Sequence, residues 1–297
     1  MGAQLRIVRR RIRTVQSTKK ITRAMELIAS SRIVKAQQRV ESSRPYAIQL
    51  TKAMEDLARQ TGSVQHPLLE DRENPSKAGI LVMTSDRGLA GAYNANVLKI
   101  AERLVREVRD RGLEPILYVI GKKGIGYFRF RGVPMRKSWQ GFSEVPPYEE
   151  AERVGRTLIR DFADEEIDEL HAAYTDFRSA FTLRATAKRF LPIAPEEVTG
   201  TGLGVVHPEY LFEPEPEEIL DHLLPQYVVT KVYAGLLESA ASENAARRRA
   251  MKAATDNAED LIKVLTRQAN RARQDEITTE IMEIAGGAEA LSAASEG

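Results

Sequence analysis

The stretch AQLRIVRRRIRTVQSTKKITRAMELIASSRIVKAQQRVESSR, from Ala3 to Arg44, contains neither glycine nor proline and decides the architecture of the chain. A second stretch of this kind runs from Leu236 to Ala285. At the rise of an α-helix, the two stretches predict rods of roughly 60 and 75 Å. Such rods are longer than a compact domain needs to cover its own core. We therefore expect them to bury their apolar stripes on each other or on a partner.

Both stretches carry apolar residues at spacings of three and four, as paired helices require. The first stripe runs through Leu5, Val8, Ile12, Val15, Lys19, Thr22, Met25, Ala29, Ile33 and Ala36. The second runs through Leu237, Ala241, Asn244, Met251, Ala258, Ile262, Leu265, Ala269 and Ala272. Alanine lets two helices approach closely but adds little apolar area. The pattern predicts a slender antiparallel coiled coil between residues 1–46 and 237–285, and the plainer alternative is two long core helices.

The composition excludes several classes of protein. The chain has 297 residues, 42% hydrophobic and 29% charged, which leaves room for one sizeable domain besides the rods. Its apolar runs, such as Ile80 to Met83, fall far short of the roughly 20 residues that span a bilayer. It has no cysteine, and its four histidines follow no ligand spacing. We therefore expect neither a metal nor a cofactor.

The first 44 residues are strongly basic, with twelve Arg or Lys residues and only two acids, although the whole chain has a net charge of +2. A basic amphipathic start also fits a transit peptide or a nucleic-acid-binding arm. Against both, the apolar periodicity continues through Ile33 and Ala36 without a break, and no aromatic side chain precedes Pro45 to stack on bases. We interpret the basic face as one that meets an acidic protein collar.

The middle of the chain has the pattern of an α/β domain. Residues 78–84 and 115–121 read as strands on either side of a helix at 94–111, which predicts a parallel, Rossmann-like sheet. A helix at 148–162 precedes two β-rich runs, 169–176 and 181–190, which we expect to form an added hairpin or edge pair. The predicted divisions are a coiled-coil helix at 1–62, the α/β domain at 63–208 and a second coiled-coil helix at 209–297.

The turn from Ser85 to Gly91 follows the first strand, where a doubly wound fold binds phosphate. It lacks the G-x-G-x-x-G spacing, and GKKGIG from Gly121 to Gly126 is not a P-loop, because no Ser or Thr follows a Gly-Lys pair. A nucleotide-dependent enzyme remains an alternative, but we predict no binding of ATP or NAD. The acidic run at 164–169 is typical of a solvated surface.

Several blocks of sequence resemble the γ subunit of the F-type ATP synthase. They are RRRIR at 9–13, STKKITRAME at 17–26, TSDRGLAGAYNAN at 84–96, YLFEPEPEEIL at 210–220, ASENAARRRAMKAATDNAEDLI at 241–262 and ITTEIMEIAGGAEAL at 277–291. The blocks occur in the family's order and spacing, so the resemblance covers essentially the whole chain.

The resemblance implies a central rotor stalk that does no chemistry itself. The coiled coil would stand inside a ring of three α and three β subunits, with the α/β domain towards the membrane. Rotation would drive each β catalytic site through different nucleotide affinities. The implied partners are the α3β3 ring, the ε subunit and the c-ring, with one copy of the chain per complex and no nucleic acid. The implied location is peripheral, on the cytoplasmic side of the cell membrane.

The resemblance also assigns contact residues, though no catalytic, cofactor or metal residues. Met25 and Arg247 match positions that face an acidic turn of the β subunit. Arg273, Gln274 and Thr278 match positions that hydrogen-bond a β-subunit loop. Tyr210, Phe212 and Glu213 match the foot that touches the polar loops of the c-ring.

The last helix is expected to extend beyond the end of the first. Ile277, Ile281 and Ile284 continue the spacing of three and four, but the first helix is too short, by roughly 10 Å or more, to cover them all. They should therefore face another partner. The pair Gly286-Gly287 is expected to mark the point where this helix frays.

Overall fold

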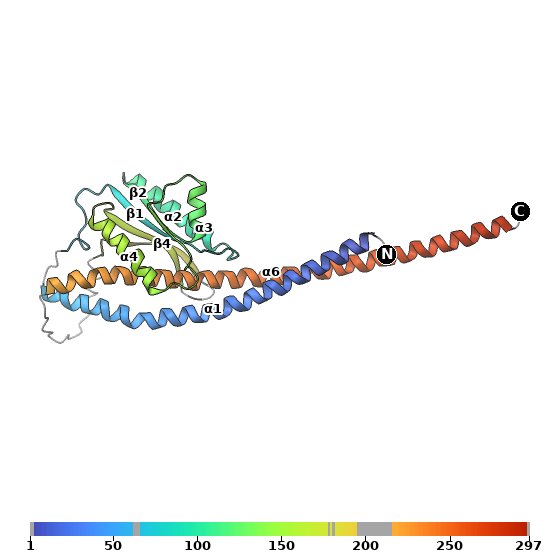
Figure 1. Ribbon diagram of the computed structural model, residues 1–297, viewed down its shortest axis with the longest axis horizontal. Coiled ribbons are helices and arrows are strands. Elements are labelled where there is room, and N and C mark those ends of the chain that lie inside the picture. The colour runs from blue at the N-terminus through green and yellow to red at the C-terminus, as the bar shows by residue number, and fades with distance from the viewer. Residues whose placement is uncertain (1–2, 62–65, 178, 180–181, 195–215, 296–297) are drawn as a thin grey trace. The chain divides into compact units, whose positions relative to one another are not determined.

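Two long helices run through the computed structural model, which describes residues 3–61, 66–177, 179, 182–194 and 216–295 (Figure 1). Helix α1 spans Ala3–Thr61 and helix α6 spans Pro216–Ser295. Each continues through an internal proline, Pro45 in α1 and Pro225 in α6. Among the described residues, no helix is both long enough and apolar enough to cross a membrane.

The chain divides into two compact units. One joins Met1–Ile28 with Arg248–Gly297, and the other is Ala29–Arg247. The first contains the start of α1 and the second half of α6. The second contains the sheet, the shorter helices and the remaining parts of the two long helices. The predicted domain boundaries at residues 62 and 208 lie outside the described residues.

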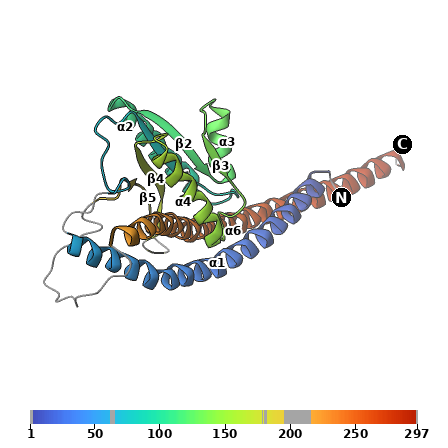
Figure 2. The same cartoon turned by 60° about the vertical axis from the view of Figure 1, so that its left-hand side comes forward.

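A five-stranded sheet forms the centre of the second unit (Figure 2). Its strands are β1 (Lys77–Met83), β2 (Glu114–Ile120), β3 (Lys137–Trp139), β4 (Glu169–Phe177) and β5 (Leu183–Leu191). They lie in the order β3-β2-β1-β4-β5. All neighbours are parallel except β4 and β5, which are antiparallel. Every residue of β1 after Lys77 is buried, because helices cover both faces of the sheet.

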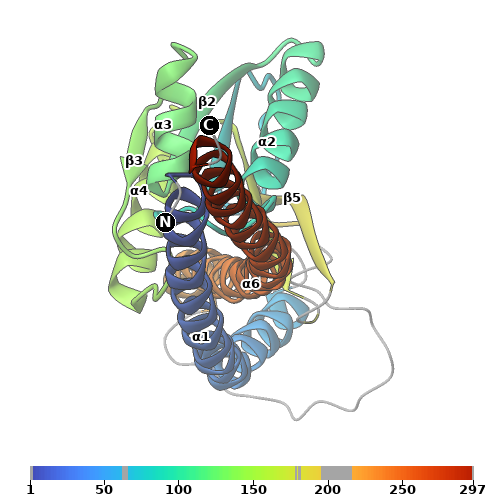
Figure 3. The same cartoon turned by 90° about the vertical axis from the view of Figure 1, so that its right-hand side faces the viewer.

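The helices of this unit form a layer on each face of the sheet (Figure 3). Helices α2 (Tyr93–Asp110) and α3 (Lys122–Phe130) cover one face. Helix α4 (Tyr148–Ala163) covers the other face together with parts of α1 and α6. A Cβ atom on Gly155 of α4 would lie 2.8 Å from a methyl group of Val229, so only glycine permits this close approach of α4 to α6.

The predicted fold class is confirmed, and four details differ. Strands β4 and β5 pair antiparallel, as expected of a hairpin, but β4 lies inside the sheet beside β1, so only β5 of these two is at an edge. Helix α3 and the short strand β3 were not predicted. Helix α6 passes through Gly286-Gly287 to Ser295, so the expected fraying point is wrong. Packing explains the first difference, since β4 is buried along most of its length and a central position suits it.

Candidate functional site

The start of α1 pairs antiparallel with the second half of α6, and the side chains define the register. The hydroxyl oxygens of Thr22 and Thr255 are 2.7 Å apart, and both residues are buried. Moving back three residues in α1 to Lys19 and forward four in α6 to Glu259 gives an ion pair of 3.1 Å. The direction is therefore opposite in the two helices. Each hydroxyl also has a possible acceptor in its own helix. This acceptor is the carbonyl oxygen of Lys19 for Thr22 and that of Met251 for Thr255.

The seam between these segments is narrow and follows the predicted stripes. Leu5 in α1 and Leu265, Ala258 and Ala269 in α6 are buried. Val8, Ile12 and Val15 are half-buried along the same face of α1. Small residues and the threonine pair contribute little apolar area per residue, so the pairing depends on close approach more than on a large hydrophobic core. The predicted slender coiled coil is confirmed.

The outer face of α1 in this unit combines basic and aliphatic side chains. Ile7, Ile21 and Leu27 are more than half exposed. The exposed cations beside them are Arg6, Arg9, Arg10, Arg11, Arg13, Lys20 and Arg23. The one acid among residues 3–28, Glu26, is buried and paired with Arg23 at 2.8 Å. This surface offers positive charge together with apolar contact area, which fits an acidic protein surface with apolar side chains.

The far part of α6 extends beyond the first residues of α1 (Figure 1). The apolar side chains of Ile277, Ile281, Met282 and Ile284 are exposed there. Arg273, Gln274 and Thr278 are exposed on the same segment, and the hydroxyl of Thr278 donates to the carbonyl oxygen of Gln274 at 3.0 Å. The guanidinium of Arg273 and the amide of Gln274 remain accessible to a partner. The structure thus places these three predicted contact residues close together, whereas Met25 is half-buried on α1.

Arg247 occupies a different environment from the one predicted for it. Its side chain is only 6% exposed and lies between two carboxylates in the unit of residues 29–247. One nitrogen contacts Glu243 on the preceding turn of α6, and another lies 3.4 Å from Glu144, which follows β3. Glu144 also pairs with Arg32 and Arg87. We call these five residues the buried ion cluster after Arg247, Glu243 and Glu144, since the side chains of Arg32 and Arg87 are 34% and 70% exposed. A contact of Arg247 with another subunit stays a prediction, and it would require this cluster to open.

Burial shapes the electrostatics of the cluster. The Glu243 side chain is 1% exposed, and burial raises its pKa while the charge of Arg247 opposes that change. Arg247 therefore compensates a carboxylate that water cannot reach. The sequence contained a signal for this pair, because residues four apart lie on one side of a helix. It contained none for Glu144, which the fold brings to α6 from more than 90 residues away.

The carboxylate of Asp86, in the glycine turn after β1, accepts hydrogen bonds from three backbone N–H groups. One carboxylate oxygen of Asp86 accepts a hydrogen bond of 3.1 Å from the backbone N–H of Lys122 at the start of α3. The other accepts from the backbone N–H groups of Gly141 and Ser143 at 2.8 and 3.1 Å. A helix N-terminus is the place where a nucleotide phosphate binds in a doubly wound fold. Here the carboxylate of Asp86 binds the first backbone N–H of α3, the helix that follows β2.

The proposed c-ring contacts Tyr210, Phe212 and Glu213 lie outside the described residues. Within the part of the chain that the structure describes, no cluster of three or more His, Cys, Asp or Glu side chains could hold a metal ion.

Comparisons with known proteins support one assignment. A family model described as ATP synthase matches residues 4–291. The chain is 56% identical to the ATP synthase gamma chain of Acidothermus cellulolyticus, with 98% of each chain covered. It is 53% identical to the ATP synthase gamma chain of Thermobifida fusca, with 100% of this chain and 99% of that relative covered.

Solved structures give the same fold at lower identity. A chain of the Euglena gracilis mitochondrial ATP synthase, in a structure of its OSCP, F1 and c-ring, superposes with a TM-score of 0.67 at 17% identity, covering 100% of this chain and 97% of that one. A chain of the central stalk and c-ring of the Tetrahymena thermophila enzyme superposes with a TM-score of 0.59 at 24% identity, covering 79% and 99%. With the full-length matches above, these findings show that the chain belongs to the ATP synthase gamma chain family.

Proposed function

We propose that this chain is the central rotor stalk of an F-type ATP synthase. In this role it couples proton-driven rotation of a c-ring to ATP synthesis or hydrolysis at the catalytic sites of β subunits, and it does no chemistry itself. The observation that carries the proposal is the pairing of α1 and α6 around a seam of small and polar residues, with an outer face that mixes cations and aliphatic side chains. Such a face can slide past a series of similar surfaces without one dominant anchor.

The proposed partners follow from the exposed surfaces and from family membership. The α3β3 ring would surround the first unit, with Met25, Arg273, Gln274 and Thr278 meeting β subunits. Arg247 is retained as a proposed β contact, subject to opening of the buried ion cluster. Tyr210, Phe212 and Glu213 would meet the c-ring, and the ε subunit would complete the rotor, with one copy of the chain per complex. The complex would hold the chain at the cytoplasmic side of the cell membrane.

The domain arrangement is proposed on the same basis. Residues 1–62 and 209–297 would supply the two shaft helices, and residues 63–208 would supply the α/β domain. The stripe at Ile277, Ile281 and Ile284 would turn within an apolar sleeve at the far end of the ring. Its exposure in the isolated chain supports this assignment, because large aliphatic side chains at one end of a helix favour a partner that covers them.

A rotation assay tests the proposal directly. The native chain has no cysteine, so replacing the exposed Lys99 of α2 with cysteine gives a single attachment point for an optical probe. The chain is assembled with the α and β subunits, and the ring is fixed to a surface. We expect ATP to drive stepwise rotation of the probe in one direction. Failure of the chain to assemble with the ring, or ATP turnover with a stationary probe, would contradict the proposal.

A further inference from the structure

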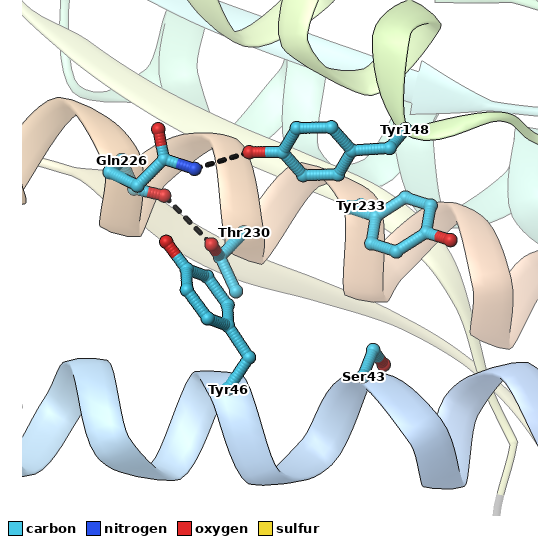
Figure 4. Close-up of a pocket in the computed structure, with 6 residues that line it drawn as sticks. All are labelled: Ser43, Tyr46, Tyr148, Gln226, Thr230 and Tyr233. Carbon is cyan, nitrogen blue, oxygen red and sulfur yellow. Dashed lines mark hydrogen bonds between the residues drawn. The ribbon is translucent and has the colours of Figure 1, made fainter.

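A cavity of about 400 Å³ lies between α1, α4 and α6 in the unit of residues 29–247 (Figure 4). Six residues line it, namely Ser43, Tyr46, Tyr148, Gln226, Thr230 and Tyr233. None of them carries a charge at neutral pH. A volume of this size lies in the range that small-molecule sites occupy in proteins.

The cavity arises from a local change in the size of side chains along α1. Ser43 and Ala47 stand on the face that α1 turns towards α6, where Leu50 and Met54, one and two turns later, are large and buried. The small residues leave space that Tyr148 and Tyr233 border. The rings of these two tyrosines meet edge to face, with centroids 5.3 Å apart and an angle of 81° between their planes. The aromatic wall is therefore held by its own packing.

Hydrogen bonds within the wall decide which polar atoms remain for a ligand. The side-chain amide of Gln226 donates to the hydroxyl oxygen of Tyr148, so the hydroxyl proton of Tyr148 is left to donate elsewhere. The hydroxyl of Thr230 donates to the backbone carbonyl of Gln226 at 2.8 Å, which leaves its oxygen as an acceptor. The hydroxyl of Tyr46 points towards Thr230 in Figure 4 and has no hydrogen-bond partner among the described residues. Burial raises the pKa of Tyr148, which keeps this hydroxyl protonated as a donor.

We propose that this three-tyrosine cavity is a binding site for a small uncharged molecule that has a planar ring and a carbonyl or hydroxyl oxygen. The ring would lie against Tyr148 and Tyr233, and the oxygen would accept hydrogen bonds from the hydroxyls of Tyr46 and Tyr148. A carboxylate or an ammonium group would give up part of its water shell while the six lining residues offer it no opposite charge, so charged analogues are disfavoured. Because α1, α4 and α6 all contribute to the wall, an occupant holds three helices together.

Two matched probes test the chemistry of the site. Benzamide has the planar ring and a neutral carbonyl, and benzoate has the same ring with a charge. We expect saturable binding of benzamide to the full-length chain by titration calorimetry and ligand-observed NMR, with benzoate at least tenfold weaker. Equal binding of the two probes, or no saturable binding of benzamide at millimolar concentration, would overturn the proposal.

Variants locate the binding. Tyr46→Phe and Tyr148→Phe each remove one donor with little change in volume, so each should weaken benzamide roughly three- to tenfold. Ser43→Phe should fill the cavity and abolish binding. Its control is Ser42→Phe, since Ser42 is exposed, adjacent, and also donates to the carbonyl of an earlier residue in its own helix. Binding that survives Ser43→Phe in a folded variant places the probe elsewhere and refutes the site.

The assembled enzyme provides the last test. Benzamide should bind the complex that contains the chain with the same dependence on Ser43 as the isolated chain. Loss of binding on assembly would show that a neighbouring subunit fills the cavity with its own side chain, and the proposal of a small-molecule site would then be wrong.

Discussion

The hydroxyl groups of Thr22 and Thr255 meet at 2.7 Å across the buried seam between α1 and α6. Each hydroxyl also has a carbonyl acceptor in its own helix, Lys19 for Thr22 and Met251 for Thr255. A threonine has only one proton to donate, so one hydroxyl donates across the seam while the other donates to its own helix. The pair can exchange these roles without leaving a buried polar group unsatisfied.

Replacing either threonine alone with valine should therefore cost little. We expect Thr22→Val and Thr255→Val each to lower the free energy of unfolding by about 1 kcal/mol, because the remaining hydroxyl keeps its carbonyl acceptor. The double variant should cost less than the sum of the two. Chemical denaturation of the four proteins in a double-mutant cycle gives the coupling energy. Costs above about 3 kcal/mol for a single variant would contradict this account of the seam.

Removing the side chain of Arg247 should strongly destabilise the fold, because the change leaves Glu243 buried without its compensating charge. We expect Arg247→Ala to destabilise the chain by about 3 to 5 kcal/mol at neutral pH. The loss should be smaller at acidic pH, where Glu243 can take up a proton. The matched control is Arg248→Ala, since Arg248 is the next residue and is exposed. Thermal denaturation at several pH values provides the measurement, and equal effects of the two variants would refute the buried ion cluster.

Glu238 should make the fold less stable as the pH rises. Burial and the nearby Asp176 raise its pKa from 4.5 to about 7, against the opposing charges of Lys188 and Arg44. Below pH 4.5 the group is protonated in the folded and unfolded chain alike. As the pH rises towards 7, only the unfolded chain releases the proton, so stability is lost progressively and the loss is complete above pH 7. The corresponding free energy is on the order of 3 kcal/mol.

The variant Glu238→Gln should remove most of this dependence. We expect it to stabilise the chain at pH 8 and to leave the stability at pH 4 nearly unchanged. Glu218→Gln is the control, because Glu218 is exposed on the same helix. Denaturation curves at the two pH values give the comparison. A stabilisation that is equal at pH 4 and pH 8 would mean that titration of Glu238 is not its cause.

The hydrogen bonds of Asp86 lead to a prediction about anions. We expect no binding of ATP or NAD by the isolated chain in equilibrium dialysis at millimolar concentration. Asp86→Ala should destabilise the α/β domain by roughly 2 kcal/mol, because three backbone N–H groups lose their acceptor. Inorganic phosphate should restore part of this loss in the variant and should not stabilise the native chain. Asp110→Ala, at an exposed position of α2, is the control.

The exposed tip of α6 should tune coupling without holding the fold. We expect Arg273→Ala combined with Gln274→Ala to weaken ATP turnover and proton transport in the reconstituted complex, at about 1.5 to 3 kcal/mol for each charge-assisted hydrogen bond lost. Lys263→Ala, also exposed on α6, should change neither. Circular dichroism of the free chain should remain native. Full coupling in the double variant would refute the contact assignment for these two residues.

The periodicity of the apolar residues predicted the pairing of the long helices well, because every residue of a repeated stripe faces the same partner. The predicted seam residues Leu5, Ala29, Ile33 and Ala36 are all buried, and so are Leu265 and Ala269. Strands β1 and β2 were predicted for a related reason, since buried parallel strands are short continuous apolar runs. The order of the strands could not be predicted, because nothing within residues 169–176 indicates which neighbour they will pair with.

Glycine misled the sequence interpretation in two places, at helix α3 and at Gly286-Gly287 of α6. Helix α3 contains Gly124, whose missing side chain leaves room for Thr84 and Val119, so packing offsets its low helix propensity. Pro45 and Pro225 lie inside long helices, where tertiary and interhelical packing outweighs a lost hydrogen bond. The environment of Arg247 also escaped prediction, since it depends on Glu144, a residue distant in the sequence.

The carboxylate of Asp86 has one more consequence. A bound phosphate comes and goes with its concentration in the cell, so a domain that depends on one changes its stiffness with the metabolic state. A carboxylate that belongs to the chain is always present at the same effective concentration. Asp86 thus links the turn after β1 to the start of α3 and to the loop at Gly141 without any bound ligand. For a rotor that transmits torque, this constancy is the useful property.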